Sequence, residues 1–195
     1  RFQRLKECAQ ALRLLMGSDL IPSAVELLDG EALGGLDLSS AEGGALLIGF
    51  DGLPEQVEWQ AEEARKLFEP LGLAEWRLLD GPARDRAWRA VREVGHRVFP
   101  EPAAVVKLGV LPTQVVETIE QTASVAQRNG LRSAFSAHPT VGIVTGVLAG
   151  GGQSAPPVIT TLIEWRDLVR STGGHLALEW APLAVKEQVA AWDPP

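Results

Sequence analysis

The sequence predicts an α+β protein, in which ferredoxin-like βαβ repeats form an antiparallel sheet with helices packed on one face. Apolar runs of strand length alternate with segments of helical period along the 195 residues. Leu53-Pro54-Glu55-Gln56-Val57 recurs as Leu111-Pro112-Thr113-Gln114-Val115. Gly72-Leu73 recurs as Gly130-Leu131 with the same offset. Two markers that share one offset indicate an internal repeat.

The first elements precede the repeat. Within residues 1–22 we expect a helix, because Leu5, Cys8, Leu12 and Leu15 have the spacing of one helical face. We interpret Cys8 on this apolar stripe as a core residue and not as a nucleophile. It is the only cysteine, which excludes an internal disulfide. A strand at 24–28 would widen the sheet.

The first copy of the repeat predicts a strand at 45–50, a helix that begins at Pro54 and a strand at 76–79. Proline fits the first turn of a helix, where its missing N–H would have no partner. Gly72 suits the left-handed residue that follows a helix. We expect one more helix at 83–94, with Trp88 and Val91 buried.

The second and third copies predict a ferredoxin-like βαββαβ core over residues 103–181. The second copy has strands at 104–110 and 131–137 around a helix that carries Val115 and Ile119. The third has strands at 143–148 and 175–180, a loop at 150–154 and a helix that begins at Pro156-Pro157. We expect six or seven strands, a helix at 183–192 and one α+β unit spanning 1–195.

Composition excludes some functions. The chain has 18 Lys and Arg, 25 Asp and Glu and a net charge of −7, with no basic run. We therefore expect no nucleic-acid binding, which needs a basic surface. No apolar run approaches the roughly 20 residues of a transmembrane helix, so we expect no transmembrane segment. With one Cys and three His, we expect no metal site.

Four segments in order along the chain resemble the C-terminal region of FAD-linked oxidases of the vanillyl-alcohol-oxidase type, and most closely the group of glycolate oxidase flavoprotein subunits. These segments are Leu47 to Gly52, Trp88 with Val91-Arg92-Glu93, Val106 to Pro112, and Gly173-Gly174-His175 through Ala181-Pro182 to Trp192-Asp193-Pro194. They span nearly the whole chain.

The resemblance implies the substrate-side cap of an FAD-dependent oxidoreductase that oxidises a 2-hydroxy acid such as glycolate to the 2-oxo acid. FAD would be bound mainly by an N-terminal domain that is absent here. The chain begins at Arg1 and its only methionine is Met16, so we expect part of a longer flavoprotein. Implied partners are a small carboxylate substrate, that FAD-binding domain and other oxidase subunits, including an iron–sulfur subunit. The implied location is cytoplasmic, reaching the inner membrane through partner subunits.

The resemblance also implies site residues. The segment Ala137 to Gly142 resembles a family segment that reads Ala-His-Ala-Gly-x-Gly, with Pro139 and Thr140 in place of its small residues. His138 is the candidate catalytic residue, because an imidazole can accept a hydroxyl proton near neutral pH. Thr140 is a candidate substrate-binding residue. The alternative for His138 is a turn histidine that hydrogen-bonds the backbone.

Lys107 and Arg92 are the candidate carboxylate-binding residues. Lys107 is a single charge within the apolar run 103–110, and could pair with substrate or be the outward residue of a half-exposed strand. Arg92 could clamp a carboxylate or lie on a solvated helix face. We expect a structural role for His175 and for the six Trp. His96 carries no signal.

A second function remains open on the residues alone. A free-standing ferredoxin-like module that binds a small molecule, or a structural module without catalysis, would show the same repeat, because fold does not fix function.

Overall fold

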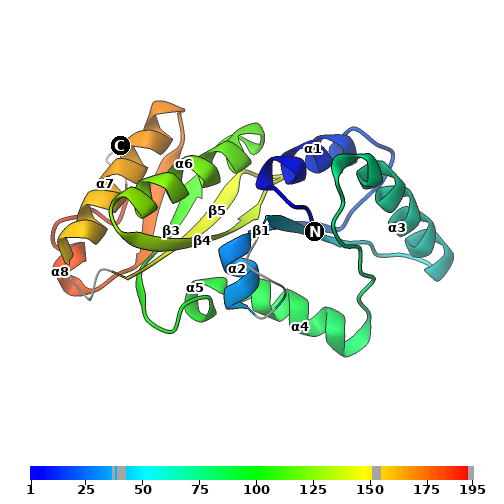
Figure 1. Ribbon diagram of the computed structural model, residues 1–195, viewed down its shortest axis with the longest axis horizontal. Coiled ribbons are helices and arrows are strands. Elements are labelled where there is room, and N and C mark those ends of the chain that lie inside the picture. The colour runs from blue at the N-terminus through cyan, green and yellow to red at the C-terminus, as the bar shows by residue number, and fades with distance from the viewer. Residues whose placement is uncertain (37, 39–42, 151–154, 193–195) are drawn as a thin grey trace.

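The computed structural model describes residues 1–36, 38, 43–150 and 155–192. Its centre is a six-stranded sheet in the order β2-β1-β4-β5-β3-β6, in which all neighbouring strands are antiparallel (Figure 1). The strands are β1 (Ala24–Asp29), β2 (Gly44–Gly49), β3 (Pro102–Gly109), β4 (Leu131–His138), β5 (Ile143–Gly150) and β6 (His175–Trp180). The predicted α+β class and antiparallel sheet are confirmed.

The part of the sheet from β3 to β6 has the ferredoxin-like topology. The chain runs β3, α6 (Val115–Arg128), β4, β5, α7 (Ala155–Ser171) and β6. The spatial order β4-β5-β3-β6 places the first and third strands of this unit side by side in the middle. A short 3₁₀ turn, η2 (Pro112–Gln114), leads into α6. Both βαβ copies are therefore where the repeat predicted them.

One face of the sheet carries the larger helical layer. It consists of α1 (Leu5–Met16), α3 (Pro54–Phe68), α6 and α7 (Figure 1). Their apolar stripes pack on the alternate strand residues that point to this side, such as Val106 and Leu108 of β3. Trp165 of α7 is fully buried and donates its Nε1–H to the carbonyl of Thr122 at 2.8 Å. Cys8 is also fully buried in this layer, as predicted.

The opposite face carries a smaller layer, which extends the prediction of helices on one face. It is formed by α2 (Gly30–Gly35), α4 (Gly81–Arg92) and α5 (Val94–Arg97). Val91, Val94 and Val98 pack there against Val105 of β3 and Val147 of β5. Because α4 starts a new layer, the chain has to cross from one face of the sheet to the other after α3.

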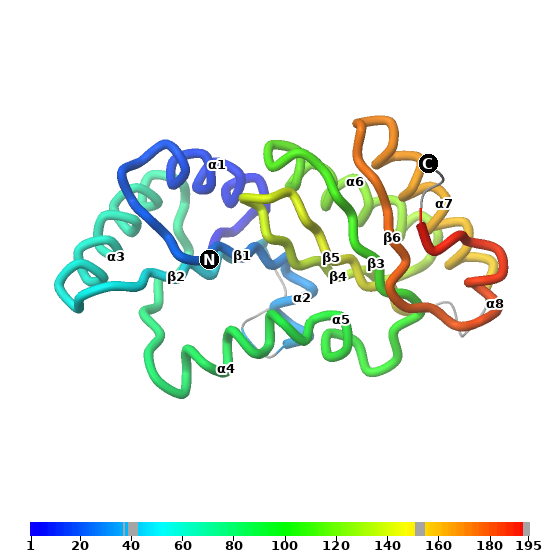
Figure 2. Tube along the Cα trace, turned by 180° about the vertical axis from the view of Figure 1, so that it is seen from behind, coloured from blue at the N-terminus to red at the C-terminus, as the bar shows by residue number. Residues whose placement is uncertain are grey.

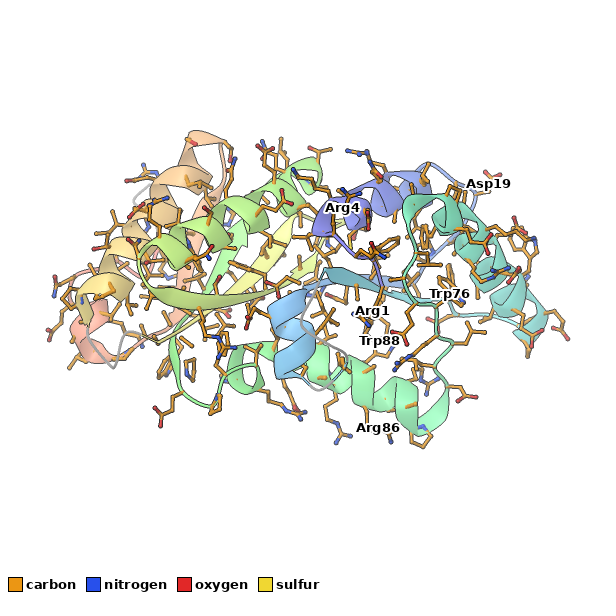
Figure 3. The ribbon with its side chains drawn as sticks, in the orientation of Figure 1. Arg1, Arg4, Asp19, Trp76, Arg86 and Trp88 are labelled. Carbon is orange, nitrogen blue, oxygen red and sulfur yellow. The ribbon has the colours of Figure 1, made fainter. Side chains whose placement is uncertain are left out.

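That crossing replaces the strand predicted at 76–79, which was wrong. Residues 74–80 have no regular structure, and Leu73 makes only an isolated bridge to Phe2. Trp76 still packs inward, with its ring centroid 6.3 Å from that of Phe68, while Leu78 is exposed. In Figure 3, Trp88 projects from α4 toward this segment and the sheet, whereas Arg86 points away.

The two repeat glycines have the same backbone conformation. Gly72 follows α3 and the 3₁₀ turn η1 (Glu69–Leu71) with φ 76°, and Gly130 follows α6 with φ 74°. Both lie in the left-handed region that L side chains avoid. The repeat marker is thus a shared way of ending a helix.

The C-terminal residues turn back along the sheet edge. The terminal helix is shorter than predicted, since α8 covers only Leu183–Lys186. The amide of Leu178 then donates to the carbonyl of Ala191 at 2.8 Å, so the tail follows the edge of β6 (Figure 2). Asp193-Pro194 and residues 151–154 of the predicted loop lie outside the described residues.

Helix lengths were tested for membrane spanning. No helix among the described residues is long and apolar enough to cross a bilayer.

Candidate functional site

The smaller helical layer covers only part of its face of the sheet. Beyond Val105 and Val147, most residues that point to this side are polar. Lys107, Thr145 and Ser136 are partners in register across β3, β5 and β4. Gly109, Ile143 and His138 are the next set of partners along the same strands. We call the region formed by these six residues the open face.

Alternation along the strands brings two predicted site residues to this region. Lys107 lies between Val106 and Leu108, which both point into the larger core, so its side chain points the other way. His138 follows Ala137, which also belongs to that core. The side chains of Lys107 and His138 are 50% and 56% exposed.

His138 has an acidic partner on the neighbouring strand. Its Nδ1 contacts Oε1 of Glu26 in β1, next to the backbone pairs Leu27–Ala137 and Leu28–Ser136. Glu26 itself is buried, with 7% exposed, and sits among apolar neighbours of its strand. The contact is incompatible with a histidine that bonds only to the turn backbone.

Burial raises the pKa of Glu26 to about 7. The desolvated carboxylate is costly to ionise unless a positive partner compensates it. A pair of titratable groups poised near neutral pH is the equipment that proton transfer requires. The open face can therefore hold and release a proton through His138.

Lys107 is also paired. Its Nζ lies 2.6 Å from Oε1 of Glu179 in β6. Both side chains are partly exposed, so this is a surface ion pair that contributes about 0–1 kcal/mol. A pair of this strength can give way to another carboxylate.

His175 borders the open face on the β6 side. It is the register partner of Gly109, and a Cβ at position 109 would lie 2.2 Å from its Cε1. The imidazole thus occupies the space that the glycine leaves, which agrees with the structural role expected for His175.

A groove of about 780 Å³ runs along this side of the molecule. Its polar lining comes from Lys107, Glu179 and His175. Its apolar lining includes Leu111, Val141, Ile143 and Trp192, all of which are exposed. A groove with a polar floor and an apolar rim suits a small polar ligand that a second surface covers.

The turn between β4 and β5 fixes the end of the open face. The amides of Val141 and Gly142 both donate to the carbonyl of His138, at 3.2 and 3.1 Å. The carbonyl of Gly142 accepts from the amide of Val110 at 2.8 Å, which ties the turn to the end of β3. Thr140 is exposed in this turn, two residues from His138, whereas Pro139 is buried.

Arg92 is not brought to this group by any described contact. It is the last residue of α4 and is exposed, and so is His96 in α5. Within the described part of the chain neither makes an ion pair or side-chain hydrogen bond.

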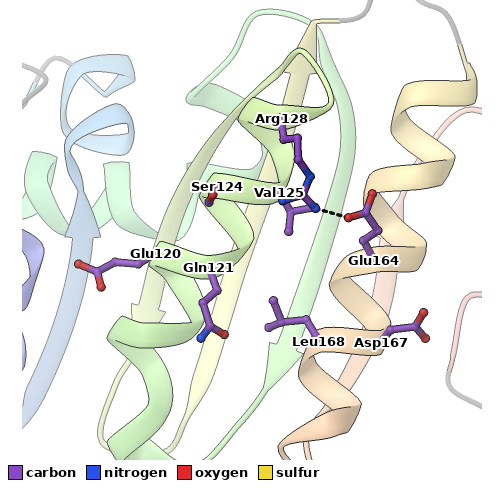
Figure 4. Close-up of a pocket in the computed structure, with 8 residues that line it drawn as sticks. All are labelled: Glu120, Gln121, Ser124, Val125, Arg128, Glu164, Asp167 and Leu168. Atoms are coloured by element: carbon purple, nitrogen blue, oxygen red, sulfur yellow. Dashed lines mark hydrogen bonds and ion pairs between the residues drawn. The ribbon is translucent and has the colours of Figure 1, made fainter.

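A second hollow lies between α6 and α7 on the larger helical layer (Figure 4). It is lined by side chains such as Glu120, Gln121 and Asp167, and the ion pair of Arg128 with Glu164 spans it. It is a shallow, solvated seam between two helices and holds none of the predicted site residues.

Two acids of the site escaped the sequence analysis. Glu26 is a single acid within the apolar strand Ala24 to Leu28, and Glu179 is a single acid in β6. Lone charges in apolar strands were the signal that singled out Lys107, and the same signal was present for both acids. Their partners could not be predicted, because register between distant strands is not visible in one sequence.

The fold and the site define an α+β domain with one sheet face left open around a proton-holding pair and a carboxylate-binding lysine. Residues 1–140 match the family described as FAD linked oxidases, C-terminal domain. The chain belongs to this family, and is a cap domain of an FAD-linked oxidase. No curated protein matches the chain.

The described residues suit the ring side of FAD better than its phosphates. A pyrophosphate is usually held by backbone N–H groups of a glycine-rich loop at a helix N-terminus. Helices α3 and α4 begin instead with proline, which lacks the N–H. The open face offers a broad surface with side-chain donors, which fits a domain that covers the ring and its substrate.

Proposed function

We propose that the open face is the substrate-side wall of an active site in which a 2-hydroxy acid such as glycolate becomes the 2-oxo acid. The observation that carries this proposal is the common placement of Lys107 and His138. Their backbones are one register step apart, on the same side of the sheet. One offers a cation for a carboxylate and the other a proton acceptor for the neighbouring hydroxyl.

The two groups match the two ends of the substrate. In a 2-hydroxy acid the carboxylate and the hydroxyl are on adjacent carbons, so one molecule can reach both residues at once. Lys107 would bind the carboxylate in exchange for Glu179, and the ammonium can turn because it is a flexible point charge. Thr140, at the end of the same face, would donate to the substrate from the turn.

Oxidation removes a hydride and a proton from the substrate. Bound FAD supplies the hydride acceptor for this class of reaction. His138 takes the hydroxyl proton at Nε2, because its Nδ1 is turned toward Glu26. Half of the His138 side chain is exposed, which gives the proton a route to solvent once the product has left.

The facing surface is the FAD-binding domain of the same protein. The exposed apolar side chains of Leu111, Val141, Ile143 and Trp192 surround the polar floor of the groove. Apolar side chains gathered at one site mark a surface that another surface covers. A covered groove excludes water, which strengthens the ionic contacts inside it. Onward electron transfer to a partner such as an iron–sulfur subunit, and a cytoplasmic location, complete the proposal.

We do not extend the proposal to Arg92, because no described contact links it to the open face. The free-standing binding module is the weaker candidate, because the family match indicates an FAD-linked oxidase.

The test uses the protein expressed from its entire reading frame. Its visible spectrum should show flavin bands, and anaerobic addition of glycolate, lactate or 2-hydroxyglutarate should bleach them for at least one acid. Acetate, propionate and glutarate have the same carboxylates without the hydroxyl and are the matched controls. Flavin bands that no 2-hydroxy acid bleaches would end the substrate proposal and leave the family assignment in place.

A further inference from the structure

We propose that Glu26 is a positioning residue for His138: its carboxylate holds the proton of Nδ1, so that the Nε2 lone pair faces the open face. The catalytic use of this pair rests on the proposed function. The pair itself does not, and can be measured without a flavin.

The geometry places the two side chains where the backbone ladder ends. Strands β1 and β4 are joined by only two register pairs, Leu27–Ala137 and Leu28–Ser136. Glu26 and His138 are the next residues beyond that ladder, and alternation puts both side chains on the same side of the sheet. The Nδ1–Oε1 contact continues the pairing of the strands with side chains.

The two partners differ sharply in burial. Glu26 is buried while more than half of the His138 side chain is exposed. Along its own strand Glu26 has Leu28 on the same side, and its register partner on β2 is Leu47. Among the described residues, His138 is the only partner of the Glu26 side chain. A buried carboxylate with a single partner orients that partner, because no competing donor is within reach.

The contact requires one proton between the two atoms. When the pair carries two protons, one bridges Nδ1 and Oε1 and the other sits on Nε2. Loss of the second proton leaves the bridge intact and exposes the Nε2 lone pair. Such a pair titrates as a unit. Burial, which raises the pKa of Glu26 to about 7, keeps this titration near neutral pH.

Other charged groups on this side of the sheet are few. Lys107 and Glu179 form their own ion pair, and their charges cancel at the distance of His138. His175 is the remaining titratable group among the residues that line the groove. The proton state of His138 is therefore set mainly by Glu26.

The proton balance of the proposed reaction follows from this arrangement. The substrate O–H bond breaks, its proton forms a bond with Nε2, and the C–H electron pair leaves as hydride to the flavin. The imidazolium that results is stabilised by the Glu26 carboxylate, as an acid behind a histidine does in other catalytic pairs. A later proton transfer from Nε2 to water restores the starting state.

Nitrogen NMR on the histidine-labelled chain tests the pair directly. His138→Gln assigns its signals among the three histidines. In the wild type we expect His138 to be an Nδ1–H tautomer above its transition. In Glu26→Gln we expect the Nε2–H form to dominate and the midpoint to fall by about one pH unit. Glu179→Gln, which removes an acid of the same face that pairs with Lys107, should leave His138 unchanged.

The wild-type spectrum keeps the test decisive if Glu26→Gln does not fold. An Nε2–H tautomer of His138 in the wild type would overturn the proposal, and so would equal effects of Glu26→Gln and Glu179→Gln. In the full-length flavoprotein, Glu26→Gln should lower kcat about 10- to 100-fold with little change in KM and move the acid limb of the pH profile. Glu26→Asp should recover part of the loss. If the NMR result holds while the wild type oxidises no 2-hydroxy acid, the pair stands and the proposed function fails.

Discussion

Lys107 Nζ lies 2.6 Å from Glu179 Oε1, across the neighbouring strands β3 and β6. The lysine of the open face is therefore neutralised until another acid replaces Glu179. Pairing also explains how a lysine is tolerated in an apolar strand. The exchange of one carboxylate for another makes the affinity of the site depend on both residues.

Lys107→Met should raise KM for a carboxylate substrate about 10-fold or more in the full-length flavoprotein, because it removes the cation. Glu179→Gln should lower KM a few-fold, because the competing carboxylate is gone. Steady-state kinetics with the best acid of the panel measures both. Lys6→Met is the matched control, since Lys6 pairs with Glu120 at 4.0 Å in the larger helical layer. Equal KM values in all four proteins would remove Lys107 from the site.

Gly142→Ala should destabilise the fold by about 3 kcal/mol or more. Gly142 has φ 75°, and a Cβ there would lie 1.9 Å from the carbonyl oxygen of Val110. Gly130→Ala is the matched control, because Gly130 has φ 74° but open space around its Cβ position. It should cost about 1 kcal/mol, the conformational term alone. Urea unfolding of the chain compares them, and similar losses would show that the turn is not tied to β3.

Glu26→Gln should make the fold less sensitive to rising pH. The pKa of Glu26 is about 7 in the folded chain, above its ordinary 4.5. Between these values the folded state keeps a proton that the unfolded state has lost, so the wild type loses stability as the pH rises. Relative to wild type, the variant should gain about 1–3 kcal/mol from pH 4.5 to 7, and the gain should level off above pH 7. The contact with His138 offsets part of this cost.

Urea unfolding of both chains at several pH values measures that difference. Asp29, whose pKa burial also raises to about 7, titrates in both chains and cancels. A difference that stays constant across this range would show that Glu26 is ionised throughout.

Cys8 should resist thiol reagents in the folded chain. Its side chain is fully buried, and burial raises the pKa of the thiol to about 12. The thiolate that reacts is therefore nearly absent at about pH 8. An aromatic disulfide reagent should label the chain only at the rate of unfolding, and added urea should make labelling immediate. Rapid labelling without urea would mean that α1 opens separately from the rest of the core.

The sequence predicts those parts of the fold whose signal is local. Proline at helix starts, glycine at helix ends and helical spacing located α3, α6 and α7, and the repeat indicated the ferredoxin-like order. The strand predicted at 76–79 failed because a short apolar run also suits a crossing between layers. Trp76 packs inward there while Leu78 is exposed, and neither belongs to a strand.

The site was predictable only by halves. His138 and Lys107 could be named from the resemblance and from a lone charge in an apolar strand. Their acidic partners required the register of β1 with β4 and of β3 with β6, which joins residues far apart in the chain. The second helical layer was missed for the same reason, because nothing local states which face α4 will cover.

The most direct measurement is the rate at which glycolate, or the best acid of the panel, bleaches the flavin of the full-length protein without oxygen. It should be compared with the rate in His138→Ala at saturating substrate. We predict a bleachable flavin in the wild type and a loss of about 100-fold or more in the variant. A wild type without flavin, or a variant that is bleached as fast as the wild type, would contradict the account of the open face.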